Sequence, residues 1–316
     1  MRFALMSEPQ QGLSYEEILA LALAAEAAGL EAFFRSDHYG SFPGPAGEPT
    51  TDAWATLAGL ARETSTIHIG SLVSPVTFRI PGSFAKQVTT VNEMSGGRVE
   101  LGMGAGWNED EHHELGIPYP DLKERYDRLE EALAIVHGLW TEPDGWTFAG
   151  EHWQVSSARF APKPMTPGRR HPNLILGGDG GPRLARLVAT YADEFNRQSA
   201  TPDRLREAYE RVRAACDAAG RDPDTVTRSA MVGVLVAETE SDLHDRVREQ
   251  LRVIGEETDA TSWLAQRRGR WIMGTLDQAN ERISELGSAG AQRIMLQDFL
   301  PRDLDMVGLL GRLAAG

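Results

Sequence analysis

The sequence predicts an α/β protein with the (β/α)8 fold of a TIM barrel. Short apolar segments of strand character alternate with longer helical segments along the whole chain. Such alternation requires a parallel sheet, because each helix carries the chain back to the start of the next strand. Eight of these units favour a closed barrel over an open sheet. We expect a single domain over residues 1–316, with insertions at roughly 141–170 and 238–272.

Eight segments are predicted to be strands because they are short, apolar and bounded by turn residues. They are residues 2–6, 31–35, 67–74, 99–103, 173–176, 194–196, 228–237 and 293–297. Helices are predicted from apolar residues at helical spacing over residues 15–28, 52–64, 81–94, 122–140, 183–191, 202–219, 276–286 and 304–313. Ser14 and Glu17 have the spacing of a capping box at the first helix, and Gly29 is a suitable C-cap for it.

The two insertions differ in character. Residues 141–165 hold several aromatic residues, glycines and prolines, which favours a hairpin over a core helix. Residues 241–263 are polar and helical in composition, and we expect one further helix there.

The composition and net charge of the chain limit the molecules that it is expected to bind. The formal net charge is −14, so the surface should repel nucleic acid and anionic membranes. Cys216 is the single cysteine, which excludes a disulfide within the chain and fits a reducing cytoplasm. The chain begins with no long apolar segment and has no run of about 18 apolar residues, so we expect neither secretion nor a membrane span. A cytoplasmic protein that acts on a small molecule is the interpretation that remains.

The strand over residues 99–103 runs into the most informative stretch of the chain. Gly102, Gly104 and Gly106 leave one side of the strand end without side chains, and Trp107 and an acidic segment follow. Bare backbone lets a flat or bulky ligand approach closely. The same glycines are equally compatible with a tight turn that only relieves backbone strain.

Polar side chains gather where the other strands end, which is where TIM barrels build their sites. Asp37 and His38 follow the second strand, and an imidazole there can exchange a proton near neutral pH. A capping aspartate beside a surface histidine is the alternative. Glu8, Ser74, Arg79, Asn196 and Arg197 follow other strands.

A glycine-rich loop separates the strand at 173–176 from the next helix. Gly177, Gly178, Gly180 and Gly181 flank Asp179 directly before Pro182. Bare N–H groups at a helix N-terminus favour an anion such as a phosphate, although the Asp179 carboxylate is an unexpected neighbour for one. A turn without chemical use is the alternative.

No metal site is predicted. Residues 110–114 (DEHHE) hold His112 and His113, but adjacent helical side chains point about 100° apart and do not easily serve one ion. The i, i+4 histidine pair of a zinc helix is missing, as are the P-loop and the complete dinucleotide-binding glycine motif.

Three stretches together resemble the bacterial luciferase-like flavin and deazaflavin oxidoreductases. They are residues 36–39 (SDHY), 70–79 (GSLVSPVTFR) and 96–107 (GGRVELGMGAGW), with residues 47–64 and 189–196 adding to the match. The resemblance covers essentially the whole chain and is strongest to the actinobacterial branch that uses coenzyme F420. It implies a TIM barrel, an oxidoreductase and a homodimer, with a separate enzyme in the cell that reduces the cofactor.

The resemblance also implies roles for particular residues. A non-proline cis peptide between Leu72 and Val73 should form a bulge behind the deazaflavin ring, and His38 should contact the substrate side of the ring or donate a proton. With Asp37 and Trp107, His38 forms the predicted catalytic group. The predicted cofactor-binding residues are Leu72, Val73, Ser74, Gly104, Ala105, Gly106, Asn108, Gly177, Gly178, Asp179, Gly180, Gly181 and Asn196.

One departure from the family pattern bears on the substrate. Sugar-phosphate dehydrogenases of this family carry a glutamate directly after the Gly-x-Gly of the fourth strand, where this chain has Trp107. We therefore expect hydride transfer between F420 and another small organic substrate, with Trp107 as a wall over it. Three alternatives stay open: an FMN-dependent monooxygenase served by a separate flavin reductase, a metal-dependent TIM-barrel hydrolase using His38, His112 and His113, and a binding module without catalytic activity.

Overall fold

The computed structural model describes residues 1–199 and 201–316 and forms a closed barrel of eight parallel strands. The barrel strands are β1 (Arg2–Ser7), β2 (Ala32–Arg35), β3 (His68–Pro75), β4 (Val99–Gly104), β7 (Asn173–Gly177), β8 (Glu194–Gln198), β9 (Thr227–Ala237) and β11 (Arg293–Asp298). Their order is β9-β11-β1-β2-β3-β4-β7-β8, and pairing of β8 with β9 closes the ring. The predicted fold is therefore confirmed.

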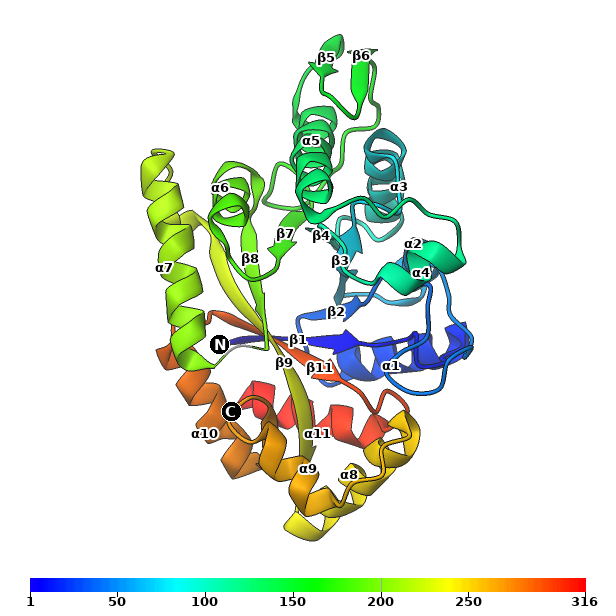
Figure 1. Ribbon diagram of the computed structural model, residues 1–316, viewed down its shortest axis with the longest axis vertical. Coiled ribbons are helices and arrows are strands. Elements are labelled where there is room, and N and C mark those ends of the chain that lie inside the picture. Colours follow the sequence, from blue (N-terminus) through cyan, green and yellow to red (C-terminus); the bar gives the residue numbers. More distant parts are fainter. Residues whose placement is uncertain (200) are drawn as a thin grey trace.

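Helices cover the outside of the barrel and follow its strands in turn (Figure 1). They are α1 (Tyr15–Ala27), α2 (Ala53–Glu63), α3 (Pro81–Met94), α5 (Leu122–Thr141), α6 (Pro182–Tyr191), α7 (Pro202–Ala218), α10 (Leu276–Ser288) and α11 (Leu304–Ala315). The predicted capping box of α1 is present, because Ser14 and Glu17 each satisfy the other's backbone N–H. Gly29 follows the C-cap with a positive φ of 75°, as a helix-ending glycine should.

The inserted segments differ in part from the expectation. The predicted hairpin is present as β5 (Trp146–Ala149) and β6 (Gln154–Ala158), which project from the barrel (Figure 1). The single helix expected over 241–263 is wrong: α8 (Glu240–Ile254) ends at Gly255 and α9 (Ala260–Arg267) begins anew. Gly255 adopts a φ of 70°, a left-handed conformation that stops a helix.

Three further short elements were not predicted. The strand β10 (Ile272–Thr275) pairs with the far end of the long strand β9, outside the closed ring. The helix α4 (Glu109–Glu114) forms within the acidic segment that follows β4. A short 3-10 turn, η1 (Pro223–Thr225), lies between α7 and β9. Elements this short that lie outside the regular alternation of strands and helices carry too few residues for a periodic pattern to identify them.

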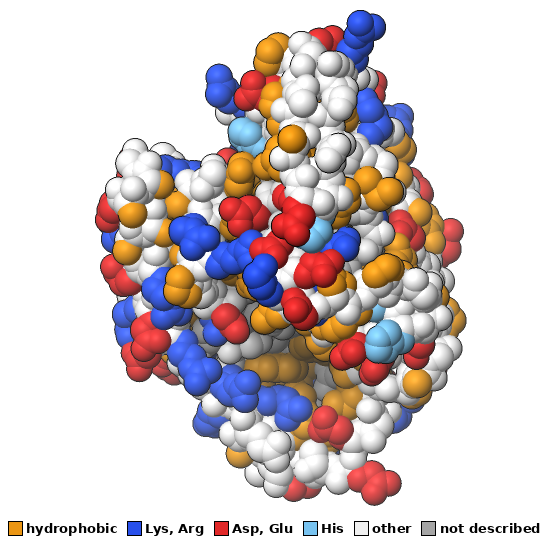
Figure 2. Space-filling view, turned by 45° about the horizontal axis from the view of Figure 1, so that its top comes forward, with side chains coloured by type: hydrophobic (Ala, Val, Ile, Leu, Met, Phe, Trp, Pro, Cys, Tyr) orange, Lys and Arg blue, Asp and Glu red, His pale blue; other side chains and the backbone are white. Residues whose placement is uncertain are grey.

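The surface carries charges of both signs. Figure 2 shows one face on which acidic and basic side chains are interspersed, with a hollow near the centre whose floor is hydrophobic. In the part of the chain that the structure describes, no helix is long and apolar enough to span a membrane.

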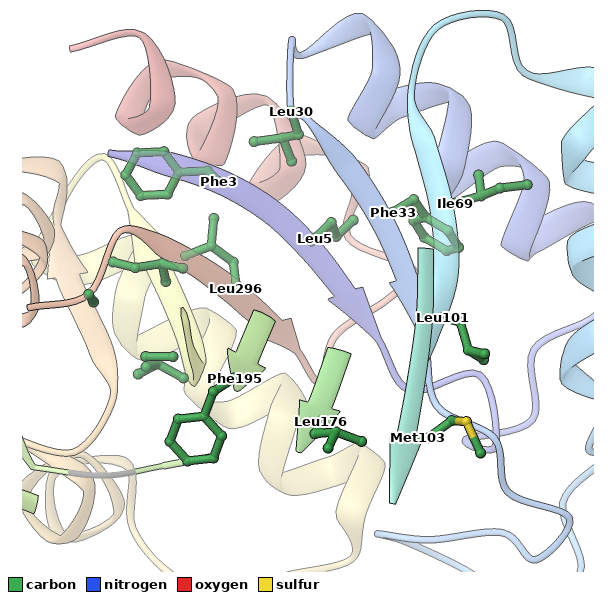
Figure 3. Close-up of a cluster of buried hydrophobic side chains, with 14 of the residues drawn as sticks. Phe3, Leu5, Leu30, Phe33, Ile69, Leu101, Met103, Leu176, Phe195 and Leu296 are labelled. Atoms are coloured by element: carbon green, nitrogen blue, oxygen red, sulfur yellow. The ribbon is translucent and has the colours of Figure 1, made fainter. Parts of the chain in front are cut away.

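The strands alternate their side chains between two apolar layers. One layer packs between the strands and the helices; Phe3, Leu5, Phe33, Ile69 and Leu101 are among its members (Figure 3). The other lies inside the ring and consists of Ala4, Met6, Ala32, Phe34, Leu72, Ile175, Met231 and Met295. Strands such as β1 and β2 are therefore buried on both faces, which explains why they are continuous apolar runs in the sequence.

A buried ion network crosses the amino-terminal end of the barrel. Arg293 on β11 donates to both carboxylate oxygens of Glu100 on β4, at 2.7 and 2.9 Å, and to Glu194 on β8 at 3.0 Å. Asn173 on β7 bridges the same two carboxylates. Although burial opposes ionisation, the Arg293 charge and a hydrogen bond from His68 lower the pKa of Glu100 well below its usual range.

Replacing Arg293 by methionine should destabilise the fold by about 3–5 kcal/mol, because two buried carboxylates lose their cation. Urea unfolding followed by circular dichroism measures the loss. The control is Arg302→Met, which removes the half-exposed ion pair with Glu17 and should cost no more than about 1 kcal/mol.

The penalty of Arg293→Met should shrink as the pH falls. The lowered pKa of Glu100 gives the wild type stability above the unfolded value of 4.5, which is lost as the carboxylate is protonated at lower pH. The variant has no such stability to lose. A penalty that is the same at pH 7 and pH 3.5 would contradict this account.

Candidate active site

A cavity of about 540 Å³ opens at the carboxyl ends of the barrel strands. It is lined by residues that follow β1, β2, β3, β4, β7, β8, β9 and β11 or lie at their ends. Of the predicted site residues it brings together His38, Leu72, Val73, Gly104, Ala105, Gly106, Trp107, Gly177, Gly178, Asp179 and Asn196. The volume lies in the range of about 300–1,000 Å³ that is usual for ligand pockets.

The predicted bulge in β3 is confirmed. The peptide bond between Leu72 and Val73 is cis, and the register of β3 against β4 shifts between Ser71 and Ser74. Both residues of the cis bond line the cavity. The bulge therefore forms part of the cavity wall, as the resemblance implied.

The glycines of β4 have a different role from the one expected. A Cβ on Gly104 would lie 2.7 Å from Val73 Cγ2, and a Cβ on Gly102 or Gly177 would lie 3.0 Å from Val73 Cγ1. These glycines form the slot that holds the Val73 side chain. The expectation of bare backbone for a ligand is wrong at Gly102, because the slot is filled from the neighbouring strand.

Three aromatic rings stand at the mouth of the cavity. The rings of His38, Phe42 and Trp107 meet edge to face, with centroid separations of 4.6, 5.4 and 5.6 Å. Trp107 is 65% exposed although it is large and apolar. Gly106 has a φ of 81°, which lets the chain turn from the strand toward Trp107.

His38 is held by a carboxylate that the sequence interpretation missed. Its Nδ1 lies 2.9 Å from Glu111 Oε1, while Glu111 Oε2 accepts from the backbone N–H groups of Tyr39 and Gly40. Despite burial, the hydrogen bond with His38 and these N–H groups lower the pKa of Glu111. An ionised Glu111 requires a proton on Nδ1 of His38, which leaves Nε2 to exchange a proton with a ligand.

Asp37 does not line the cavity. Its carboxylate is buried, accepts from Arg79 at 2.6 and 3.1 Å and accepts from Ser74 Oγ at 2.6 Å. Ser74 in turn accepts from Trp54 Nε1. Both Asp37 and Ser74 were predicted as site residues, but these bonds place them behind the bulge, where they hold β2 and β3 together.

The glycine-rich loop divides into two parts. Gly177, Gly178 and Asp179 line the cavity, whereas Gly180 packs so closely that a Cβ would lie 3.0 Å from Phe195. Gly181 is the N-cap of α6 and has open space where a side chain would be. The Asp179 carboxylate is paired with Arg197 at 2.6 Å, which accounts for an anionic residue in this loop.

Two other predicted residues lie apart from one another. Asn196 is buried, lines the cavity and donates to Ser229 Oγ. Asn108 lines a neighbouring hollow on the other side of Trp107, so its predicted contact with a cofactor has no support from the cavity.

A second cluster of polar side chains, centred on Glu8, borders the cavity. Glu8 accepts from Gln10 and from Gln297, and Ser36 donates to Gln10. Asp298, next in the chain to Gln297, is fully buried; burial, Asp303 and Glu8 raise its pKa to about 7. The sequence pointed to Glu8 only through its place after the first strand.

The histidines of α4 do not converge on a metal ion. His112 is buried and uses both ring nitrogens within the protein, on Thr77 Oγ1 and the Asn108 carbonyl, while His113 is exposed. Among residues 1–199 and 201–316, no three His, Cys, Asp or Glu side chains are grouped to hold a metal ion. The hydrolase alternative therefore has no ligand set in the described chain.

Comparison with known proteins assigns the family. Residues 1–308 match the profile of the luciferase-like monooxygenase family. The chain belongs to this family.

Two curated relatives illustrate its range. An F420-dependent glucose-6-phosphate dehydrogenase of Nakamurella multipartita is 32% identical over 62% of this chain and 55% of its own length. The pyrimidine monooxygenase RutA of Stutzerimonas stutzeri is 29% identical over 69% of this chain and 59% of its own length. The chain thus spans little more than half the length of these relatives.

A solved structure agrees on the fold. An F420-dependent secondary alcohol dehydrogenase in complex with an F420–acetone adduct superposes with a TM-score of 0.82. The alignment covers 99% of this chain and 97% of that one at 20% identity.

Replacing Glu111 by alanine should loosen the segment that follows β2, because the N–H groups of Tyr39 and Gly40 lose their acceptor. We expect these two amides to exchange with solvent about ten-fold faster or more, the equivalent of roughly 1.4 kcal/mol per opening. Hydrogen exchange measured by NMR reports the exchange rates of both amides. Glu114→Ala, an exposed change on the same helix, is the control, and equal exchange in the two variants would contradict the role of Glu111.

Proposed function

We propose that this protein is an oxidoreductase that binds coenzyme F420 in the barrel cavity. It transfers a hydride between C5 of the deazaflavin and a small organic substrate, and His38 exchanges the accompanying proton. The observation that carries this proposal is the cavity between the Leu72–Val73 bulge and His38. F420-dependent enzymes among the relatives support the choice of cofactor.

The lining residues fit a flat ring with a phosphate-bearing tail. Leu72 and Val73 would lie behind the ring, with Ala105 and Gly106 beside it. The loop at Gly177 and Gly178 would hold the phosphate, because it precedes the N-terminus of α6 and because the space at Gly181 is open. Two arginines lie beside this loop: Arg197 is paired with the Asp179 carboxylate, and Arg211 donates to the Gly180 carbonyl.

The bound deazaflavin supplies a carbon that carries a hydride. His38 contributes the proton: in the reducing direction Nε2 donates H⁺ while the substrate gains the hydride and its two electrons. Glu111 holds the imidazole through Nδ1. The aromatic side chains of Phe42 and Trp107 would cover a bound substrate on the side away from the ring.

An FMN-dependent monooxygenase is the second candidate. The family description and the similarity to pyrimidine monooxygenase RutA both favour it. The same bulge and loop would hold a flavin and its phosphate, and a separate flavin reductase would then be required. A homodimer, a cytoplasmic location and a cofactor-reducing partner stay predictions from the family resemblance.

Titration of the purified protein with F420 and with FMN, followed by tryptophan fluorescence, separates the two candidates. We expect micromolar binding of F420 and at least about ten-fold weaker binding of FMN, a difference of roughly 1.4 kcal/mol. Micromolar binding of FMN without binding of F420 would replace the first proposal by the second. Binding of neither would contradict both.

Replacing His38 by glutamine should lower kcat by about 10²–10⁴-fold, the usual contribution of a positioned acid or base. The dissociation constant for F420 should stay within about two-fold, because His38 acts on the substrate side of the ring. Exposed His113 offers the matched control, His113→Gln. Equal turnover in the two variants would remove His38 from the mechanism.

A further inference from the structure

The substrate end of the cavity carries no cation to receive an anionic substrate. The titratable residues that line the cavity as a whole are Glu8, His38, Tyr126 and Asp179, of which Asp179 belongs to the loop at the cofactor side, and the remaining polar ones are the neutral Ser36, Asn196, Gln198 and Gln297. No lysine or arginine lines it within residues 1–199 and 201–316. Arg197 is paired with Asp179, and Arg79 is paired with Asp37.

The approach to this end is acidic as well. A second hollow of about 440 Å³ lies on the other side of Phe42 and Trp107. Its charged lining residues are all carboxylates, Glu48, Asp110, Glu111 and Glu114, as far as the described chain extends. Like charges so placed repel an anion before it reaches His38 and disfavour it inside.

The walls at this end favour an uncharged ring. Phe42 and Trp107 stand edge to face at 5.4 Å, and Pro43, Leu122 and Phe299 continue the apolar surface. The exposed Trp107 ring offers area that a flat ligand covers, and aromatic contacts of this kind stabilise by about 0.5–1.5 kcal/mol beyond the buried area. Glu8 and Gln297 on the floor, together with His38, supply hydrogen bonds to one polar group.

We propose that the substrate is an uncharged aromatic or alicyclic compound with a single carbonyl, nitro or hydroxyl group, and that phosphate esters are rejected. This inference rests on the proposed function for its reaction. It departs from the phosphorylated sugar used by the F420-dependent glucose-6-phosphate dehydrogenases among the relatives. Trp107, Phe42 and the absence of a cation determine the specificity.

A matched pair of ligands tests the inference: 4-nitrobenzyl alcohol and 4-nitrobenzyl phosphate, which share the ring and differ in charge. Saturation-transfer NMR at pH 8 measures the binding of each to the protein with and without F420. We expect the dissociation constant of the alcohol to be at least about ten-fold lower than that of the phosphate. Equal or tighter binding of the phosphate, or no binding of the alcohol, would overturn the proposal.

Two variants test whether the aromatic ligand contacts the Trp107 ring. Trp107→Ala should weaken binding of the alcohol by about five-fold or more, while the dissociation constant for F420 stays within about two-fold. Leu115→Ala, an exposed apolar change at the end of α4, should change neither. Unchanged binding of the alcohol to Trp107→Ala would remove Trp107 from the specificity.

Failure of this specificity proposal can be distinguished from failure of the proposed function. If neither F420 nor FMN binds, the proposed reaction fails, but the ligand pair still reports the specificity of the cofactor-free cavity. If a cofactor binds and the phosphate ester is preferred, the reaction stands and this inference fails.

Discussion

The charge network at Arg293 is the interaction on which the rest of this barrel depends. Arg293 ties β11 to β4 and β8 across the interior, and Asn173 adds β7. A buried ion network of this kind contributes little net stability over an apolar core of equal volume, but leaving it half-formed is costly. It therefore favours one arrangement of the strands over others, and it closes the amino-terminal end of the barrel.

Above this network the interior is layered. Apolar side chains such as Met6, Phe34 and Met295 fill the middle of the ring, and the cis bulge of β3 forms the next layer. The glycines of β4 and β7 accommodate Val73, so the shape of the cavity wall depends on small residues from two neighbouring strands. Substituting any of these glycines would displace the bulge and thereby the wall.

Electrostatics divides the carboxyl end of the barrel into two sides. Arg197 and the loop before α6 lie at one side, and the carboxylates of α4 with His38 lie at the other. Glu111 has two roles: it orients His38 through Nδ1, and it accepts hydrogen bonds from the backbone N–H groups of Tyr39 and Gly40. A phosphate-bearing cofactor and an uncharged substrate match this division.

The sequence by itself determined the barrel and the capping box of α1, because these follow from local periodicity and from short-range spacing, and its resemblance to a known family gave the position of the cis bond and about half of the cavity lining. Only the tertiary structure decided what the polar residues do. It paired His38 with Glu111 and Asp37 with Arg79, which are separated by 73 and 42 positions in the chain. It also assigned Gly102 to a packing slot for Val73 and turned Asn108 away from the cavity. A local pattern carries no information on which distant side chain will satisfy a charge or fill a space, since burial and pairing arise only when the ring of strands closes.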